Sequence, residues 1–92
     1  MHQAEQMISN LRMRVDSRGS TSVVQVEGDI DCKTSSKVKK TISTLFRDSF
    51  VKRVIVDLKR AVHIDDVGAS TLVDALEAAN REGKDFILTG LN

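Results

Sequence analysis

The sequence of 92 residues contains no proline, no tryptophan and no tyrosine, and its aromatic content of 3% comes from three phenylalanines. The core must therefore be built mainly from valine, isoleucine and leucine. Without proline no stiffened linker divides the chain, and a chain of this length forms one small domain. Such a domain buries only about 60–65% of the surface that its unfolded chain exposes, so its margin of stability is narrow.

Cysteine is also nearly absent, since Cys32 stands alone. A disulfide framework and a thiolate metal site both need more cysteines. A catalytic thiol would need a histidine as its base, but His2 and His63 fall on other predicted segments. A metal site at His63 would need more ligands than Asp65. We therefore expect a buried or inert Cys32, no bound metal and no cofactor.

An excess of charge of one sign is missing, because the net charge is +1 and acidic and basic residues are mixed along the chain. A nucleic-acid-binding protein gathers lysine and arginine on one stripe, with aromatic side chains for stacking. Here the densest basic cluster, formed by Lys37, Lys39 and Lys40, is predicted to lie on the solvated side of a helix. We therefore expect no nucleic-acid partner.

Long hydrophobic runs are missing as well. No apolar segment approaches the roughly 20 residues that span a membrane, and the N-terminus holds no signal-peptide core. Residues 1–10 are polar and weakly patterned, which predicts a flexible N-terminal tail. The protein is expected to be cytoplasmic, without membrane insertion.

Residues 11–92 are predicted to form one domain that opens with a hairpin. Apolar and charged residues alternate over 11–15, which is typical of a half-exposed strand. Residues 17–20 contain a glycine and predict a tight turn, and a second strand follows over 22–26.

After this hairpin, from Asp31 on, the apolar period changes to that of a helix. One stripe of the helix is formed by Val38, Ile42, Leu45 and Phe46. Either Asp31 or Thr34 can cap its first turn through a side-chain oxygen.

Residues 54–58 are apolar apart from Asp57 and do not alternate, which predicts a central strand covered on both faces. A second helix is predicted over 67–82, with Gly83 as its C-cap, and a last apolar strand over 86–89. The core side of the second helix is formed by Leu72, Leu76 and Ala79. The order β-β-α-β-α-β predicts an α/β fold, with a small mixed β-sheet, an opening antiparallel hairpin, parallel crossovers and helices packed on one face.

Two stretches resemble the signature of STAS domains, a family that shares this order of elements. The first is Glu27-Gly28-Asp29-Ile30-Asp31, followed by Thr34, and is similar to the family's glycine–acid–hydrophobic–aspartate stretch before a threonine. The second is Ile64-Asp65-Asp66-Val67-Gly68, and is similar to the family's Asp-Ser-Ser-Gly loop at the start of the second helix. The resemblance is to STAS domains of the anti-sigma factor antagonist type, and it covers residues 11–92.

The resemblance implies a bacterial, non-enzymatic regulator of transcription that binds an anti-sigma factor or a kinase-like protein. An alternative is a regulatory subunit of a transporter ATPase or of a signalling scaffold, which would use the same surface. In both cases the implied partner surface lies at the start of the second helix and beside it, at Asp29, Asp31, Asp65, Asp66, Val67 and Gly68.

In these antagonists the serine just before the glycine accepts a phosphoryl group from the partner kinase. The equivalent position here is Val67, which has no hydroxyl and cannot be phosphorylated. Asp65 and Asp66 also have a structural explanation, since acidic side chains cap the start of a helix. Gly68 would either relieve crowding or let the backbone of a partner approach closely.

STAS domains continue past the last strand into a further helix, whereas this sequence ends at Asn92. The sequence is therefore either a truncated piece of such a domain or a minimal form that covers the exposed sheet by association, and in both cases apolar residues over 86–91 are expected to be exposed. Because exposed apolar patches drive association, we predict a homodimer or a poorly soluble chain.

Residues 54–57 also resemble the phosphoacceptor strand of response-regulator receiver domains. That chemistry requires Mg²⁺, held by an acidic pair after the first strand, and a lysine after a late strand. Here Asp16 is followed by Ser17, and Lys84 precedes the last strand. Since the sequence also offers no nucleophile–base pair and no phosphate-binding loop, no enzyme is predicted.

Overall fold

The chain opens with a long antiparallel hairpin in the computed structural model, which describes residues 10–91. The hairpin consists of β1 (Leu11–Arg18) and β2 (Thr21–Ile30), joined by a turn in which Gly19 has a φ of 60°. Glycine adopts a positive φ without strain, and tight hairpin turns require it. The predicted hairpin is confirmed, although β2 continues to Ile30 instead of ending at residue 26. Of the predicted tail, only Asn10 lies within the described residues.

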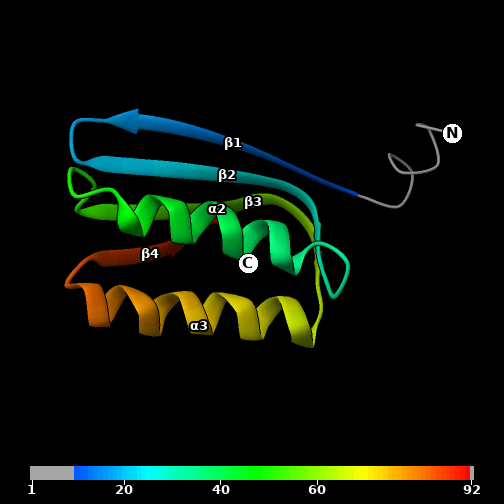
Figure 1. Cartoon of the computed structure of the whole chain (residues 1–92). Helices are drawn as coiled ribbons and strands as arrows, with labels where there is room; N and C mark the ends of the chain where they lie inside the picture. The colour runs from blue at the N-terminus through cyan, green and yellow to red at the C-terminus, as the bar shows by residue number, and fades with distance from the viewer. Residues whose placement is uncertain (1–9, 92) are drawn as a thin grey trace, which may run out of the picture.

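Two strand–helix–strand crossovers complete the sheet (Figure 1). β2 is followed by α2 (Ser35–Arg47) and β3 (Arg53–Ile64), and β3 is followed by α3 (Asp66–Glu82) and β4 (Asp85–Thr89). The strand order is β1-β2-β3-β4, with an antiparallel β1–β2 pair and parallel β2–β3 and β3–β4 pairs. This arrangement confirms the predicted fold class. None of the helices within residues 10–91 is long and apolar enough to cross a membrane.

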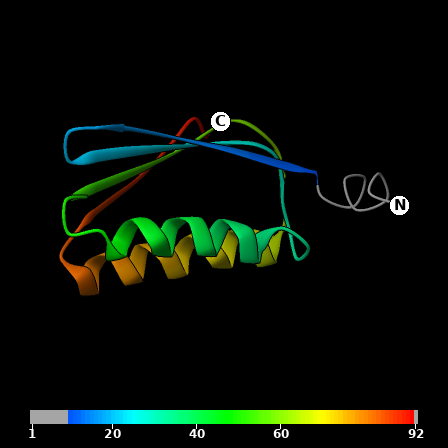
Figure 2. The ribbon, with the colours of Figure 1, turned by 45° about the horizontal axis from the view of Figure 1, so that its top comes forward.

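Both helices lie on the same face of the sheet, as Figure 2 shows. Right-handed crossovers that step across a sheet in one direction place their helices on one side. The prediction that the central strand is covered on both faces is therefore wrong, since Ile55 and Asp57 point to the open face and are only half-buried. A shallow hollow on this open face is lined by polar side chains that include Arg12, Arg14, Gln25 and Glu27.

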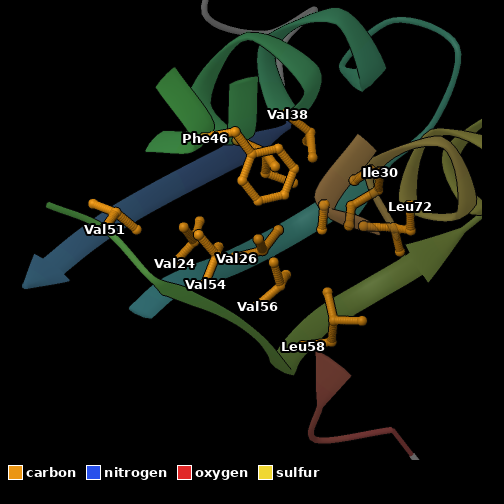
Figure 3. Close-up of a cluster of buried hydrophobic side chains, with 13 residues drawn as sticks. Val24, Val26, Ile30, Val38, Phe46, Val51, Val54, Val56, Leu58 and Leu72 are labelled. Atoms are coloured by element: carbon orange, nitrogen blue, oxygen red, sulfur yellow. The ribbon is translucent and has the colours of Figure 1, made fainter. Parts of the chain in front are cut away.

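The core fills the space between the sheet and the two helices (Figure 3). The buried hydrophobic residues of β2 and β3 are Val24, Val26, Ile30, Val54, Val56 and Leu58. From α2, Val38, Ile42 and Phe46 are buried and Leu45 packs against them, which confirms the predicted stripe. The Phe46 ring meets the Phe86 ring edge-on, with 6.0 Å between the centroids. Such a pair adds about 0.5–1.5 kcal/mol to the gain from burial.

Two predicted positions of side chains are wrong. Leu72 and Ala79 are buried in α3 as predicted, but Leu76 is 46% exposed, and Ala75 takes its place in the core. Leu76 lies on the side of α3 toward β4, where it lines an apolar groove. Of the two alternatives predicted for Cys32, buried or inert, burial is wrong, since Cys32 is exposed in the loop between β2 and α2, which projects beyond the end of the sheet (Figure 1).

Candidate partner-binding site at the starts of α2 and α3

The start of α3 is fixed by its capping residue, Asp65. The backbone of Asp65 is extended, and its Oδ1 accepts a hydrogen bond of 2.8 Å from the N–H of Gly68. Its own N–H donates to the carbonyl oxygen of Ile30 at 3.2 Å, which ties the start of α3 to the end of β2. A cap of this kind contributes about 0.5–2 kcal/mol. The capping explanation predicted for Asp65 is therefore confirmed.

Gly68 is buried at the point where α3 crosses the end of β2. A Cβ atom added at Gly68 would lie 2.1 Å from the carbonyl oxygen of Ile30 and 2.8 Å from its carbonyl carbon. These are backbone atoms, which cannot rotate away as the end of a side chain can. The crowding predicted for Gly68 is thus real, and it arises from the chain's own β2.

The loop between β2 and α2 is organised by Asp31 and Thr34. Oδ1 of Asp31 accepts hydrogen bonds from the N–H groups of Lys33 and Thr34, at 2.9 and 3.2 Å. The hydroxyl of Thr34 is buried, accepts from the N–H of Asp31 at 2.9 Å and donates to the carbonyl of Asp29 at 2.8 Å. Thr34 occupies the N-cap position of α2 but makes no side-chain cap bond. Of the two predicted caps, neither bonds a helical N–H, because both side chains bind the backbone of the preceding loop.

Replacing Thr34 by valine should lower the free energy of unfolding by about 2 kcal/mol. Valine keeps the shape of the side chain but leaves the N–H of Asp31 and the carbonyl of Asp29 without their partner. Thr44→Val is the matched control, since the Thr44 hydroxyl donates to the carbonyl of Lys40 at an exposed position and its loss should change stability by less than about 0.5 kcal/mol. Urea unfolding of both variants measures the difference. Equal midpoints would show that the Thr34 hydroxyl does not hold the loop.

Asn10, the last residue of the predicted tail, is held against this loop. Its carbonyl oxygen accepts from the N–H of Asp29 at 2.8 Å, and its Nδ2 donates to Oδ2 of Asp29 at 2.9 Å. Gly28, with a φ of 104°, permits the contact, because a Cβ there would lie 2.1 Å from the carbonyl oxygen of Asn10. The Asp29 carboxylate is therefore already engaged within the chain.

The structure brings the two predicted segments to the same end of the sheet (Figure 1). β2 and β3 are parallel neighbours, with Asp29 paired to His63 and Ile30 paired to Ile64. Val67, in the first turn of α3, is 46% exposed. Of the four aspartates in the two segments, Asp66 is exposed, and the other three are half-buried: Asp29, Asp31 and Asp65.

Val67 lies on the side of α3 that faces α2. Thr71, Asp74 and Ala78 follow it at i+4, i+7 and i+11, so they share its face of the helix. These three residues line the groove between the two helices. The exposed part of the Val67 side chain therefore faces α2 and not β4.

The carboxylates of Asp29, Asp31 and Asp65 accept hydrogen bonds from the chain itself, whereas that of Asp66 accepts none within residues 10–91. No ion pair within residues 10–91 involves the carboxylates of Asp29, Asp31, Asp65 or Asp66. Arginine and lysine form strong hydrogen bonds with such carboxylates. Within the same part of the chain, no group of three or more His, Cys, Asp or Glu side chains is arranged to hold a metal ion.

Two features near this site were not predicted from the sequence. The first is Asn10, for which a weakly patterned tail gives no signal. The second is the exposed apolar side of α3 at Val73 and Leu76. The spacing of Ala69, Val73 and Leu76 at i, i+4 and i+7 could have revealed it, because that spacing places all three on one stripe.

The sequence model of the STAS domain matches residues 12–92. The chain belongs to the STAS domain family. The match includes both predicted signature stretches, and it accords with the order and pairing of the strands.

Solved structures of other proteins share this STAS fold. The Bacillus anti-sigma factor antagonist SpoIIAA, in its unphosphorylated form, is 17% identical with a TM-score of 0.75, and the alignment covers 88% of this chain and 74% of SpoIIAA. An anti-sigma factor antagonist from Mycobacterium paratuberculosis is 25% identical with a TM-score of 0.74, covering 87% of this chain and 68% of the antagonist. The STAS domain described here therefore resembles anti-sigma factor antagonists.

The same fold also occurs inside a longer protein. A crystal structure of Mglu matches with 20% identity and a TM-score of 0.73, and its glutamate form matches with 14% identity and a TM-score of 0.76. The present chain spans 18% of the first of these chains and 27% of the second. At this identity the likeness concerns the fold alone.

Proposed function

We propose that this STAS domain is a non-enzymatic regulator that binds an anti-sigma factor with serine kinase activity, and that binding frees a sigma factor. The observation that carries the proposal is the half-exposed Val67 at the start of α3, in a segment with aspartates and beside a second acidic loop. The likeness to an anti-sigma factor antagonist from Mycobacterium paratuberculosis supports the class of partner.

The chemistry of the surface indicates how the partner would bind. An exposed valine gains free energy when a partner covers it, and the carboxylates around the two helix starts would pair with arginine or lysine of the partner. Charged pairs at the rim of an interface mainly speed association and select the partner. The apolar contact at Val67 would then supply the central anchor.

Val67 also implies that binding is not switched off by phosphorylation at this position. We equate Val67 with the phosphoacceptor serine of the antagonists because the loop at residues 64–68 resembles theirs, and valine offers no oxygen for a phosphoryl group. Ser70 is exposed but lies one turn further into α3, and the Thr71 hydroxyl donates to the carbonyl of Val67 at 3.0 Å. Binding would therefore be constitutive or set by the amount of protein.

Replacing Val67 by serine should create a phosphoacceptor. Wild type, Val67→Ser and Val67→Ala are each incubated with an anti-sigma kinase from the same organism and ATP, and intact mass spectrometry counts the phosphoryl groups. We expect one phosphoryl group on Val67→Ser, located by fragmentation to residue 67, and none on the others. Val67→Ala is the matched control, because it removes the same apolar contact without adding a hydroxyl.

Two outcomes would contradict the proposal. An unmodified Val67→Ser after incubation with this kinase would show that the kinase does not dock at the start of α3. Phosphorylation of wild type at Ser70 or Thr71 would show that regulation uses a substitute acceptor.

A further inference from the structure

The proposed partner surface at Val67 continues along a groove between α2 and α3, which lie side by side on the sheet (Figure 1). The groove has a volume of about 330 Å³, and its lining residues belong to these two helices. Thr71, Asp74 and Ala78 are among them, and they follow Val67 on the same side of α3. A partner segment that covers Val67 would therefore reach the groove directly.

The two walls of this groove carry opposite charge. Lys39 is exposed on the wall formed by α2, a helix that contains no acidic residue. Asp74 and Glu77 are exposed on the wall formed by α3, where like charges at i and i+3 repel each other. The groove therefore offers an ammonium group on one side and two carboxylates on the other.

These charges do not neutralise one another across the groove. Within the described part of the chain, no ion pair and no side-chain hydrogen bond involves Lys39, Asp74 or Glu77. Along α3, Arg81 lies one turn after Glu77, whereas residues 70–78 contain no basic residue that could offset Asp74. Asp74 and Lys39 are thus the two charges of the groove that a partner can satisfy.

We propose that the anti-sigma factor of the proposed function, on which this inference rests, lays a segment along the groove. Lysine or arginine of this segment faces Asp74, and aspartate or glutamate faces Lys39. Val67 anchors the complex, while Asp74 and Lys39 determine which anti-sigma factor is bound. An anti-sigma factor with the opposite pattern of charge is rejected, because placing like charges against each other costs free energy.

A second copy of the chain is the alternative occupant. A symmetric contact places the same surface on both copies, so Lys39 of one copy would face Asp74 of the other. A stable homodimer also needs an apolar core in its interface. Of the large apolar side chains that α2 and α3 expose, Val67 alone lies beside this groove, and one half-exposed valine does not form such a core. The observations therefore favour the anti-sigma factor.

Charge reversals in the whole chain test the proposal, with the anti-sigma factor from the same organism as the probe. Asp74→Lys and Lys39→Glu should each weaken binding about tenfold, and the loss should shrink as salt is added. The matched controls are Glu82→Lys and Lys40→Glu, the same changes at exposed positions of the same helices outside the groove. They should change binding by less than about twofold. Surface plasmon resonance at low and high salt measures all four variants.

Val67→Arg, measured beside these variants, separates the groove from the proposed function. Loss of binding in Val67→Arg, with Asp74→Lys and Lys39→Glu behaving like their controls, would overturn the role of the groove and leave the proposed function standing. A wild-type chain that does not bind the anti-sigma factor would overturn both. A homodimer in sedimentation that Asp74→Lys dissociates would make a second copy the occupant and overturn the role of the groove.

Discussion

Gly68→Ala should lower the free energy of unfolding by about 2–4 kcal/mol, although alanine is the better helix former. The new Cβ would lie 2.1 Å from the carbonyl oxygen of Ile30, far inside van der Waals contact. The same oxygen accepts the N–H of Asp65. Moving α3 away from Ile30 would therefore strain this bond and the capping bond from Gly68 to Asp65, so the clash cannot be relieved locally. The loss exceeds the gain in helix propensity of about 1 kcal/mol.

Gly83→Ala is the control for this prediction. Gly83 has a φ of 69°, but a Cβ there meets no atom within 4 Å. Its replacement costs only the left-handed conformation, about 1 kcal/mol. Urea unfolding of both variants compares the cost of the steric clash at residue 68 with the cost of the left-handed backbone conformation at residue 83. If Gly68→Ala is no less stable than Gly83→Ala, the close packing of α3 on Ile30 is contradicted.

The architecture could be predicted because a local pattern in the sequence indicates each strand, turn and helix. The alternation over 11–15, the glycine at residue 19 and the stripe from Val38 to Phe46 are set by nearest neighbours on a strand, a turn or a helix. Once the order of elements is known, the handedness of crossovers leaves few topologies. The mixed sheet and the placement of both helices on one face follow from these two rules.

The lengths of the strands and the choice of buried side in α3 depend on contacts between distant residues. β3 continues to Ile64 because it stays paired with β2 through register shifts, which no local pattern encodes. Leu76 fits the core side of α3 by its spacing as well as Ala75 does. The position of α3 between α2 and β4 decides which of the two is buried. That position depends on how the helices pack on the assembled sheet.

The candidate site was predictable in position but not in its internal contacts. Loops that follow parallel strands meet at one end of a sheet, so Asp31 and Asp65 were expected together. Capping by Asp65 also follows from local rules. The burial of the Thr34 hydroxyl between Asp31 and Asp29 does not, because a threonine before a helix ordinarily bonds the helix itself.

Val67→Arg should reduce binding of the anti-sigma factor by more than about thirtyfold while leaving the fold intact. Val67 is half-exposed in the first turn of α3, so a longer side chain can extend into solvent without entering the core. Its guanidinium would block the apolar contact and compete with the partner's cations for the chain's own aspartates, Asp66 among them. Both effects act against a partner that presents arginine or lysine around an apolar centre.

Circular dichroism and a pull-down of the anti-sigma factor, made on the same sample of Val67→Arg, test this result. Phe50→Arg serves as the control, because Phe50 is 82% exposed in the loop between α2 and β3. This loop lies at the opposite end of the sheet from both helix starts (Figure 1). The control variant should bind as wild type does, so that a loss seen only at residue 67 cannot come from the added charge alone. Retained binding with a native spectrum would remove Val67 from the partner surface. A collapsed spectrum would instead show that Val67 supports the packing of α3, and the acidic loops alone would then have to carry recognition.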